Sequence, residues 1–466
     1  MFALILLYAY FVSFLDKPEK SAPALSERAI EQRTKWHIDI DELDYPVSEL
    51  YVDSLRRMGV QVYHVSRWFN GATVEMDKTT ATKVAQIPFV TGIEMTRDNS
   101  SPSLWLQKRS VQREEVGLRS VGRWTDEQLA VYNLTPLHEA GYEGQGILMT
   151  VCDGGFYNAN TMSCFRQSEL ELGHFDFTDD TDGFYGSTGT HGTECLSLIS
   201  GVTNDYYGAA TRAQYYLMRA EESATESPKE MDNLVAALEK SDSLGVNVFS
   251  VSLGYAIFDN NSWTLPKSAL NGKSTRASRA AGIAARKGML VCVAAGNEGN
   301  SAWHTIDSPG DADSILTVGA VGVDSIIGGF SSYGPSADGR IKPEVCAVGE
   351  QATVILPNGT IVTGNGTSFA TPLIAGLAAS LWSALPDENA MQIRERIIRS
   401  ADRYNNPDTN QYGYGIPDAW KAYTNGEWLE VRGERMEEKP QKILRGDQIL
   451  IIRHGHIYNL AGQRIE

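Results

Sequence analysis

The stretch that decides the fold is Gly364-Asn365-Gly366-Thr367-Ser368-Phe369-Ala370-Thr371-Pro372, and an apolar run from Leu373 to Trp382 follows it. The run predicts a buried helix, and the small residues before it bring the backbone close to one serine. We expect Ser368 in the first turn of that helix, where free N–H groups and the positive end of the helix dipole stabilise an oxyanion. Pro372 is expected in the same turn, because a first-turn residue has no helical partner for an N–H. A glycine-rich turn capped by serine is the simpler interpretation of these residues alone.

Composition indicates an ordered globular protein and excludes several classes. The chain has 466 residues, of which 42% are hydrophobic and 43 are glycine, so it can hold two or three domains with a large core. Its formal net charge of −17 argues against a nucleic-acid partner, which would select clustered Lys and Arg. The five cysteines show no metal-binding spacing. A disulfide between Cys164 and another cysteine is left as an alternative.

The N-terminal part predicts a small α+β domain. Residues 1–9 resemble a truncated signal segment, and the apolar run they begin is too short to span a bilayer. Residues 10–96 then predict strand, helix, strand, strand, helix and strand with one extra helix, which is a ferredoxin-like order. His64 is expected to be a strand residue without a catalytic role. Residues 97–130 lose periodicity and are typical of an exposed, cleavable linker.

Residues 131–425 alternate between strands and helices, which predicts a parallel sheet. Strands are expected at 147–152, 214–220, 246–251, 289–295 and 315–321. Ser227 and Glu230 form a capping-box pattern for a helix that ends at Gly245. Residues 426–466 predict a charged linker and a β-hairpin tail that turns at His454-Gly455. Metal binding by His454 and His456 is a minor alternative.

Three polar residues stand at strand or helix ends of this sheet and suit acyl-transfer chemistry. Ser368 is the candidate nucleophile, His191 the base, and Asp153, at the end of an apolar strand, the group that orients the histidine. Asn297 follows another strand and can offer its amide to an oxyanion beside the Ser368 N–H. Each residue alone is more simply a turn or cap residue. The acidic residues Asp176, Asp179, Asp180 and Asp182 have the oxygens that calcium prefers, but a solvated acidic loop is the favoured interpretation.

At this point the chain resembles the subtilisin-like serine proteases, the subtilases, over about residues 130–425. The matching segments are Val151-Cys-Asp153-Gly-Gly, His191-Gly-Thr, Val248-Phe-Ser-Val-Ser252-Leu-Gly254, Ala294-Ala-Gly-Asn297, Phe330-Ser-Ser-Tyr-Gly-Pro335 and Gly366-Thr-Ser368-Phe-Ala-Thr-Pro372. The resemblance implies an α/β three-layer sandwich with a mostly parallel sheet. It also implies a serine endopeptidase made as a zymogen, with residues 10–96 as its inhibitory propeptide. Glu194 and Cys195 stand where many relatives carry His and Val.

The resemblance also bears on partners and place. We expect polypeptide substrates, the chain's own prodomain as inhibitor, no nucleic acid and no transmembrane helix. We expect that no cofactor is required; structural calcium stays open as an alternative, without an assignable site. The protein is expected to be secreted or held in the cell envelope of a bacterium, in the periplasm or on the outer surface. The tail is similar to short C-terminal sorting tails of secreted bacterial proteases.

Substrate is expected to lie along two small-residue segments as an added strand. These substrate-binding candidates are Ser252, Leu253, Gly254, Ala294, Ala295 and Gly296. Their low bulk favours a large apolar or aromatic P1 residue, the residue before the cleaved bond, while Glu298 nearby could attract a basic one. The alternative function is a catalytically silent binding or surface protein with the same fold. A missing triad member would favour that alternative, and all three are present.

Overall fold

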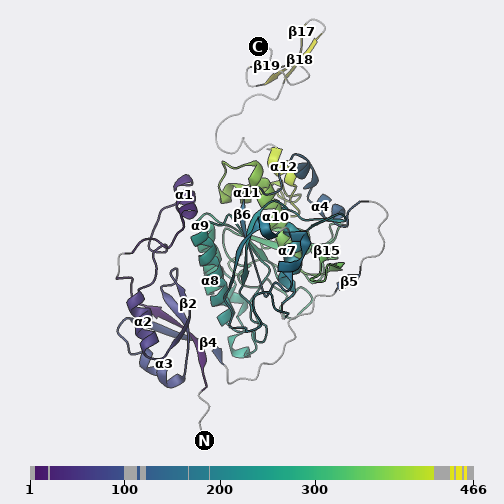
Figure 1. Cartoon of the computed structure of the whole chain (residues 1–466). Coiled ribbons are helices and arrows are strands. Elements are labelled where there is room, and N and C mark those ends of the chain that lie inside the picture. The colour runs from purple at the N-terminus through teal and green to yellow at the C-terminus, as the bar shows by residue number, and fades with distance from the viewer. Residues whose placement is uncertain are drawn as a thin grey trace. The chain divides into compact units, whose positions relative to one another are not determined.

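The structure is a computed structural model that describes residues 6–18, 21–98, 113–115, 122–165, 167–187, 189–424, 441–445, 448–453 and 456–458 (Figure 1). Its contacts divide the chain into two compact units, Met1–Tyr423 and Thr424–Glu466. Within the described residues, no helix combines the length and the apolarity that a bilayer crossing requires.

The N-terminal part of the first unit, which we call the prodomain, is a four-stranded antiparallel sheet with helices. Its elements are β1 (Tyr8–Phe14), α1 (Glu27–Lys35), α2 (Glu49–Arg57), β2 (Gln61–Ser66), β3 (Gly71–Met76), α3 (Lys78–Val84) and β4 (Val90–Asp98). The strand order β2-β3-β1-β4 is ferredoxin-like, so the predicted topology is confirmed. Alternate strand residues such as Tyr10 and Val74 face one apolar core with Leu55 of α2.

Two expectations at the edges of the prodomain need correction. β1 begins at Tyr8 rather than Tyr10, because Tyr8 and Ala9 already pair with β3 and β4. The linker also carries regular structure, since β5 (Arg113–Glu115) and α4 (Asp126–Ala130) both lie inside it. β5 has too few residues for a periodic pattern, and its pairing depends on a distant strand.

The rest of the first unit, which we call the catalytic domain after the expectation from the sequence, is built on a seven-stranded parallel sheet of order β14-β13-β12-β11-β6-β10-β7. Its strands are β6 (Leu148–Asp153), β7 (Glu171–Asp176), β10 (Gln214–Arg219), β11 (Val248–Val251), β12 (Leu290–Ala294), β13 (Leu316–Val321) and β14 (Val345–Val348). The central strands are buried on both faces, which explains their continuous apolar runs.

Helices cover both faces of this sheet and give three layers. On one face, α7 (His191–Ser200), α10 (Thr367–Ala384) and α11 (Ala390–Ser400) pack in one apolar core. On the other, α8 (Lys229–Leu244) and α9 (Arg276–Arg286) pack in a second core (Figure 1). Smaller elements complete the domain: α5 (Thr135–Glu139), α6 (Gln167–Leu170), α12 (Ala419–Thr424), the pair β8 (Val202–Thr203) and β9 (Tyr206–Tyr207), and β15 (Ala352–Ile355) with β16 (Ile361–Gly364).

The start of α8 differs from the predicted capping box. Glu230 accepts a bond from the Ser227 N–H at 3.3 Å, but the Ser227 hydroxyl is buried without a partner and Pro228 is the N-cap. Only half of the box therefore forms. The other end is as expected, because Gly245 has a left-handed backbone with φ of 74°.

The prodomain lies against α8 and α9 through polar contacts that are mostly buried. His64 of β2 makes contacts of 2.8 Å to the Phe177 carbonyl and 3.0 Å to Asn233 Oδ1, which confirms a structural role for this histidine. Asp242 of α8 accepts from two prodomain arginines, Arg33 at 2.8 Å and Arg67 at 2.6 Å. The prodomain is thus held by specific charge pairs and not only by apolar contact.

The second unit contains three antiparallel strands, β17 (Gln441–Arg445), β18 (Gln448–Arg453) and β19 (His456–Tyr458). The predicted hairpin corresponds to β18 and β19, and β17 adds a third strand. The His454-Gly455 turn and the side chain of His456 lie outside the described residues.

Candidate active site

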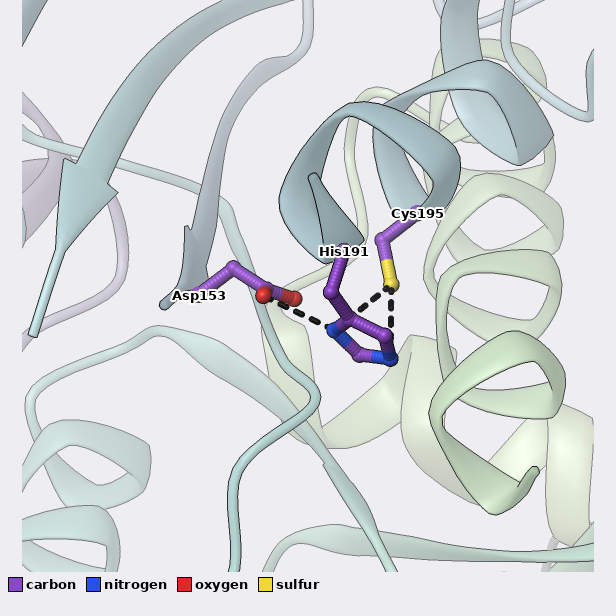
Figure 2. A group of neighbouring side chains, drawn as sticks. All are labelled: Asp153, His191 and Cys195. Carbon is purple, nitrogen blue, oxygen red and sulfur yellow. Dashed lines mark hydrogen bonds and ion pairs between the residues drawn. The ribbon is translucent and has the colours of Figure 1, made fainter. Parts of the chain in front are cut away.

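Asp153 and His191 meet at the carboxyl end of the central sheet. Asp153 is the last residue of β6 and fully buried, and His191 is the first residue of α7. His191 Nδ1 lies 2.8 Å from Asp153 Oδ1, which also accepts from the Gly154 N–H at 2.8 Å (Figure 2). Burial lowers the pKa of His191, but the attraction of the Asp153 carboxylate outweighs it and holds the pKa well above its ordinary value. The pair therefore suits a base that becomes a stabilised imidazolium.

Ser368 lies in the first turn of α10, as the sequence predicts, but Pro372 does not. α10 begins at Thr367, so Pro372 is five residues further on, inside the helix. Its missing N–H leaves the Ser368 carbonyl without the usual helical bond. That carbonyl instead accepts from Ser252 Oγ at 2.8 Å and from Cys195 Sγ at 3.4 Å. The proline thus frees an acceptor that ties the nucleophile's backbone to the residue after β11 and to α7.

Two candidate oxyanion donors converge beside Gly366. Asn297 Oδ1 accepts from the Thr367 N–H at 2.9 Å and from Thr367 Oγ1 at 3.1 Å, which holds the amide in one orientation. A Cβ atom on Gly366 would lie 3.7 Å from Ser368 N and 3.8 Å from Asn297 Nδ2. Both nitrogens therefore border the same small space, as an oxyanion hole requires.

Ser368 and His191 are neighbours without a direct hydrogen bond between described atoms. Ser368 Oγ donates to the Ser252 carbonyl at 3.4 Å. The His191 ring stacks on Phe369, with 5.7 Å between ring centroids. Because Phe369 follows Ser368, this stacking keeps the imidazole over the first turn of α10. Catalytic contacts are often long in unliganded sites and shorten when substrate binds.

Cys195 is a member of the site that the sequence analysis did not assign. Its sulfur lies 3.8 Å from His191 Nδ1 and 4.0 Å from Nε2 (Figure 2). The spacing from His191 to Cys195 is four residues, which places two side chains on one helix face and could have indicated the contact. Burial raises the pKa of Cys195 to about 11. The thiol therefore stays protonated at neutral pH and donates to the Ser368 carbonyl.

The two segments proposed as substrate edges differ in the structure. Leu253 and Gly254 follow β11, and their backbone groups make no hydrogen bond among the described residues. Ala295 is bonded at both its N–H and its carbonyl, to Val318 and Asp307. Gly296 donates to Thr367 Oγ1 and accepts from Ser332. An added strand can therefore pair with the first segment, whereas Ala295 and Gly296 can only form a wall.

The acidic residues considered for calcium have cationic partners instead. Arg219, 1% exposed, pairs with Asp180 at 2.5 Å, Asp182 at 2.8 Å and Asp176 at 3.7 Å. Asp179 pairs with Arg97 at 2.8 Å, an interaction that lowers the pKa of Asp179 against the opposing effect of burial. Asp176, Asp179 and Asp182 are exposed, as the solvated-loop interpretation expects, and the arginine pairs are a feature that the sequence did not predict.

Two groups among the described residues bring three metal-ligand side chains within 4.8 Å of one another. One is Asp153, His191 and Cys195, which belongs to the site above. The other is Glu221, Glu226 and Glu230, where Glu230 accepts from the backbone of Glu222 at 2.7 Å. All five cysteines are buried and free, so the structure does not contain the disulfide that the sequence analysis considered for Cys164.

Comparison with known proteins defines the class. The profile of the subtilase family matches residues 144–415, and that of the Bacteroidota peptidase S8 propeptide domain matches residues 9–115. The chain belongs to the subtilase family.

Individual relatives are more distant. Serine protease AprX of Bacillus subtilis (strain 168) is 35% identical over 153 residues, which cover 28% of this chain and 34% of AprX. Subtilisin NAT of Bacillus subtilis subsp. natto is 28% identical over 283 residues, or 60% of this chain and 66% of the relative. The matches thus span about one third and just under two thirds of these relatives. The crystal structure of MycP1 from the ESX-1 type VII secretion system aligns with a TM-score of 0.53 and 21% identity, over 68% of this chain and 90% of MycP1, and shows the same fold.

Proposed function

We propose that this chain is the precursor of a secreted serine endopeptidase. The observation that carries the proposal is the joint placement of the Asp153–His191 pair, Ser368, and the two donors beside Gly366. A fold of this family without catalysis would need none of these groups in register. The silent-protein alternative is therefore disfavoured.

In the proposed reaction, Ser368 Oγ attacks the peptide carbonyl while His191 removes its proton. The oxyanion of the tetrahedral intermediate binds the Ser368 N–H and the Asn297 amide. His191 then gives the proton to the leaving amine, and the C–N bond breaks to leave an acyl-enzyme. Water then attacks the acyl-enzyme with His191 again acting as the base, which releases the carboxylic acid product and restores Ser368. Asp153 holds the imidazole in the correct tautomer and stabilises its charged form.

An open apolar groove supports a preference for large apolar residues on the acyl side of the cleaved bond. Ile257, Asn261, Thr264, Ala302 and Trp303 line it. Ile257 comes three residues after Gly254. We therefore expect the part of a peptide substrate that precedes the cleaved bond, when paired with Leu253 and Gly254, to reach the groove. We therefore expect broad cleavage with large apolar or aromatic residues favoured.

The prodomain is proposed to inhibit the enzyme until it is removed. Support comes from the propeptide match and from the buried charge pairs that hold this domain on α8. Secretion is supported by the same match and by the similarity to subtilisins.

The decisive test is labelling with a fluorophosphonate probe followed by mass mapping of the modified residue. We expect one label on Ser368, lost in Ser368→Ala and retained in Ser383→Ala, a matched change further along α10. Peptide hydrolysis should fall by about 10⁴–10⁶-fold in Ser368→Ala, a range carried over from related proteases. Wild-type hydrolysis in that variant would refute the proposal.

A further inference from the structure

A three-residue strand from the linker pairs with the strand that leads into the nucleophile. β5 runs antiparallel to β16, with Arg113 opposite Gly364. Gly364 ends β16 and precedes Ser368 by four residues. β5 is thus an extended peptide paired with the strand that leads to the reacting serine, and strand pairing is a common way for proteins to bind peptides.

The side chain of Arg113 ends on a buried carboxylate one turn from the base. Its Nε donates to Glu194 Oε2 at 2.9 Å, and its Nη2 donates to Glu194 Oε1 at 2.7 Å. Glu194 is fully buried and lies three residues after His191 on α7. A bidentate contact of this kind is specific for a guanidinium group. A carboxylate buried so deeply is costly without a cationic partner.

The position of β5 assigns it to one side of the cleaved bond. The acyl half of a substrate is expected along Leu253 and Gly254, on the β11 side of Ser368, where Ser252 contacts the serine. β16 lies in a different sheet from β11 and ends four residues before Ser368. We therefore take a peptide paired with β16 to be the leaving-group half.

We propose that Glu194 is the base of a subsite for arginine or lysine on the leaving-group side, and that Arg113 fills this subsite in the full chain. The inference rests on the proposed protease function and adds a substrate class to it. Arg113 lies within the residues that match the propeptide domain, so processing can remove it and leave the carboxylate to a substrate. Arginine should be preferred over lysine, because only its planar fork matches both carboxylate oxygens.

The test uses quenched fluorescent peptides with arginine or citrulline at each of the first four positions after the cleaved bond. Citrulline keeps the shape of arginine and removes its charge. The full-length protein and its Arg113→Gln variant are assayed after the same processing incubation. At one position, kcat/KM should be about ten- to hundredfold higher for arginine, which is the range for hydrogen bonds to a charged group. Glu194→Gln should abolish that preference while citrulline peptides are still cleaved. Glu139→Gln, an equal charge change at an exposed residue of α5 outside the propeptide match, should retain it.

Several results would overturn the inference. Equal rates for arginine and citrulline at every leaving-group position in the wild type would do so without any variant. So would a preference confined to the acyl side, or an equal loss on both peptides in Glu194→Gln, since the ion pair would then only support α7. Labelling of Ser368 by the fluorophosphonate probe distinguishes failure of the subsite proposal from failure of the proposed protease function. A labelled enzyme without the preference refutes this subsite alone, whereas no labelling refutes the protease function.

Discussion

Replacing Asp44 by asparagine should loosen the prodomain from the catalytic domain. Asp44 is fully buried and bridges the two domains. It accepts from Arg33 of the prodomain at 2.9 Å and from Lys287, which follows α9 in the catalytic domain, at 2.6 Å. Burial raises the pKa of Asp44, but the bonds from Lys287, the Asp41 backbone and Arg33 outweigh it, and the pKa lies below its ordinary value. The fold therefore favours the charged form.

The expected loss of docking free energy depends on which carboxylates still pair with Arg33 and Lys287 in the variant. Breaking a buried ion pair typically costs about 3–5 kcal/mol. Arg33 retains Asp242 at 2.8 Å, and Lys287 retains the half-exposed Asp41 at 2.8 Å. We therefore expect the docking free energy to fall by about 2–3 kcal/mol, near or below the low end of that range. This corresponds to a change of about 30- to 150-fold in the docking equilibrium.

The assay is hydrogen exchange measured by mass spectrometry on the full chain, with Ser368→Ala as the background to prevent self-cleavage. α1 is the reporter, because Arg28 and Gln32 bond to the Gly245 carbonyl of the catalytic domain at 3.0 and 2.9 Å. Amides of α1 should exchange about 30- to 150-fold faster in Asp44→Asn at neutral pH, if exchange follows the docking equilibrium.

Asp53→Asn is the matched control, because its pair with Arg56 is exposed and worth at most about 1 kcal/mol. A change in α1 no larger than in this control would refute the reasoning. The pH dependence gives a second check. Since the pKa of Asp44 is depressed by folding, its contribution is present above its unfolded value, about 3.9, and is lost as the pH falls below it. The difference between variant and wild type should therefore shrink in strong acid.

Three further predictions concern the site and the prodomain. The acid limb of the kcat/KM profile should lie above pH 6.5, since Asp153 raises the pKa of His191; a limb at or below 6.5 would contradict this. Asn297→Leu should lower kcat by about 10²–10³ with little change in KM, as found for one such donor in a related protease, and an effect on KM alone would assign the amide to binding. Burial and Lys229 lower the pKa of His64, so docking should weaken as the pH falls below about 6.5. His64→Gln should reduce that acid sensitivity in the exchange assay, and an unchanged dependence would exclude His64 as its source.

Much of the fold could be predicted because local patterns agree with the final packing. The apolar run of β6 and the glycine after α8 each set an element or its end by local chemistry. Most of the candidate site followed as well, since Asp153, His191 and Ser368 stand at ends of strands and helices of one sheet. In a parallel sheet such ends gather at one edge.

The sequence by itself therefore determined the order of elements, the parallel sheet, the prodomain topology and the residue types of the site. Only the tertiary structure decided which polar groups meet across long stretches of chain. Pro372 leaves the Ser368 carbonyl to Ser252 and Cys195, and Glu194 receives Arg113 from 81 residues away. Periodicity and caps act within a few residues, whereas these pairings depend on how distant strands and helices pack. A buried carboxylate or carbonyl must find a partner, but the sequence does not say which one.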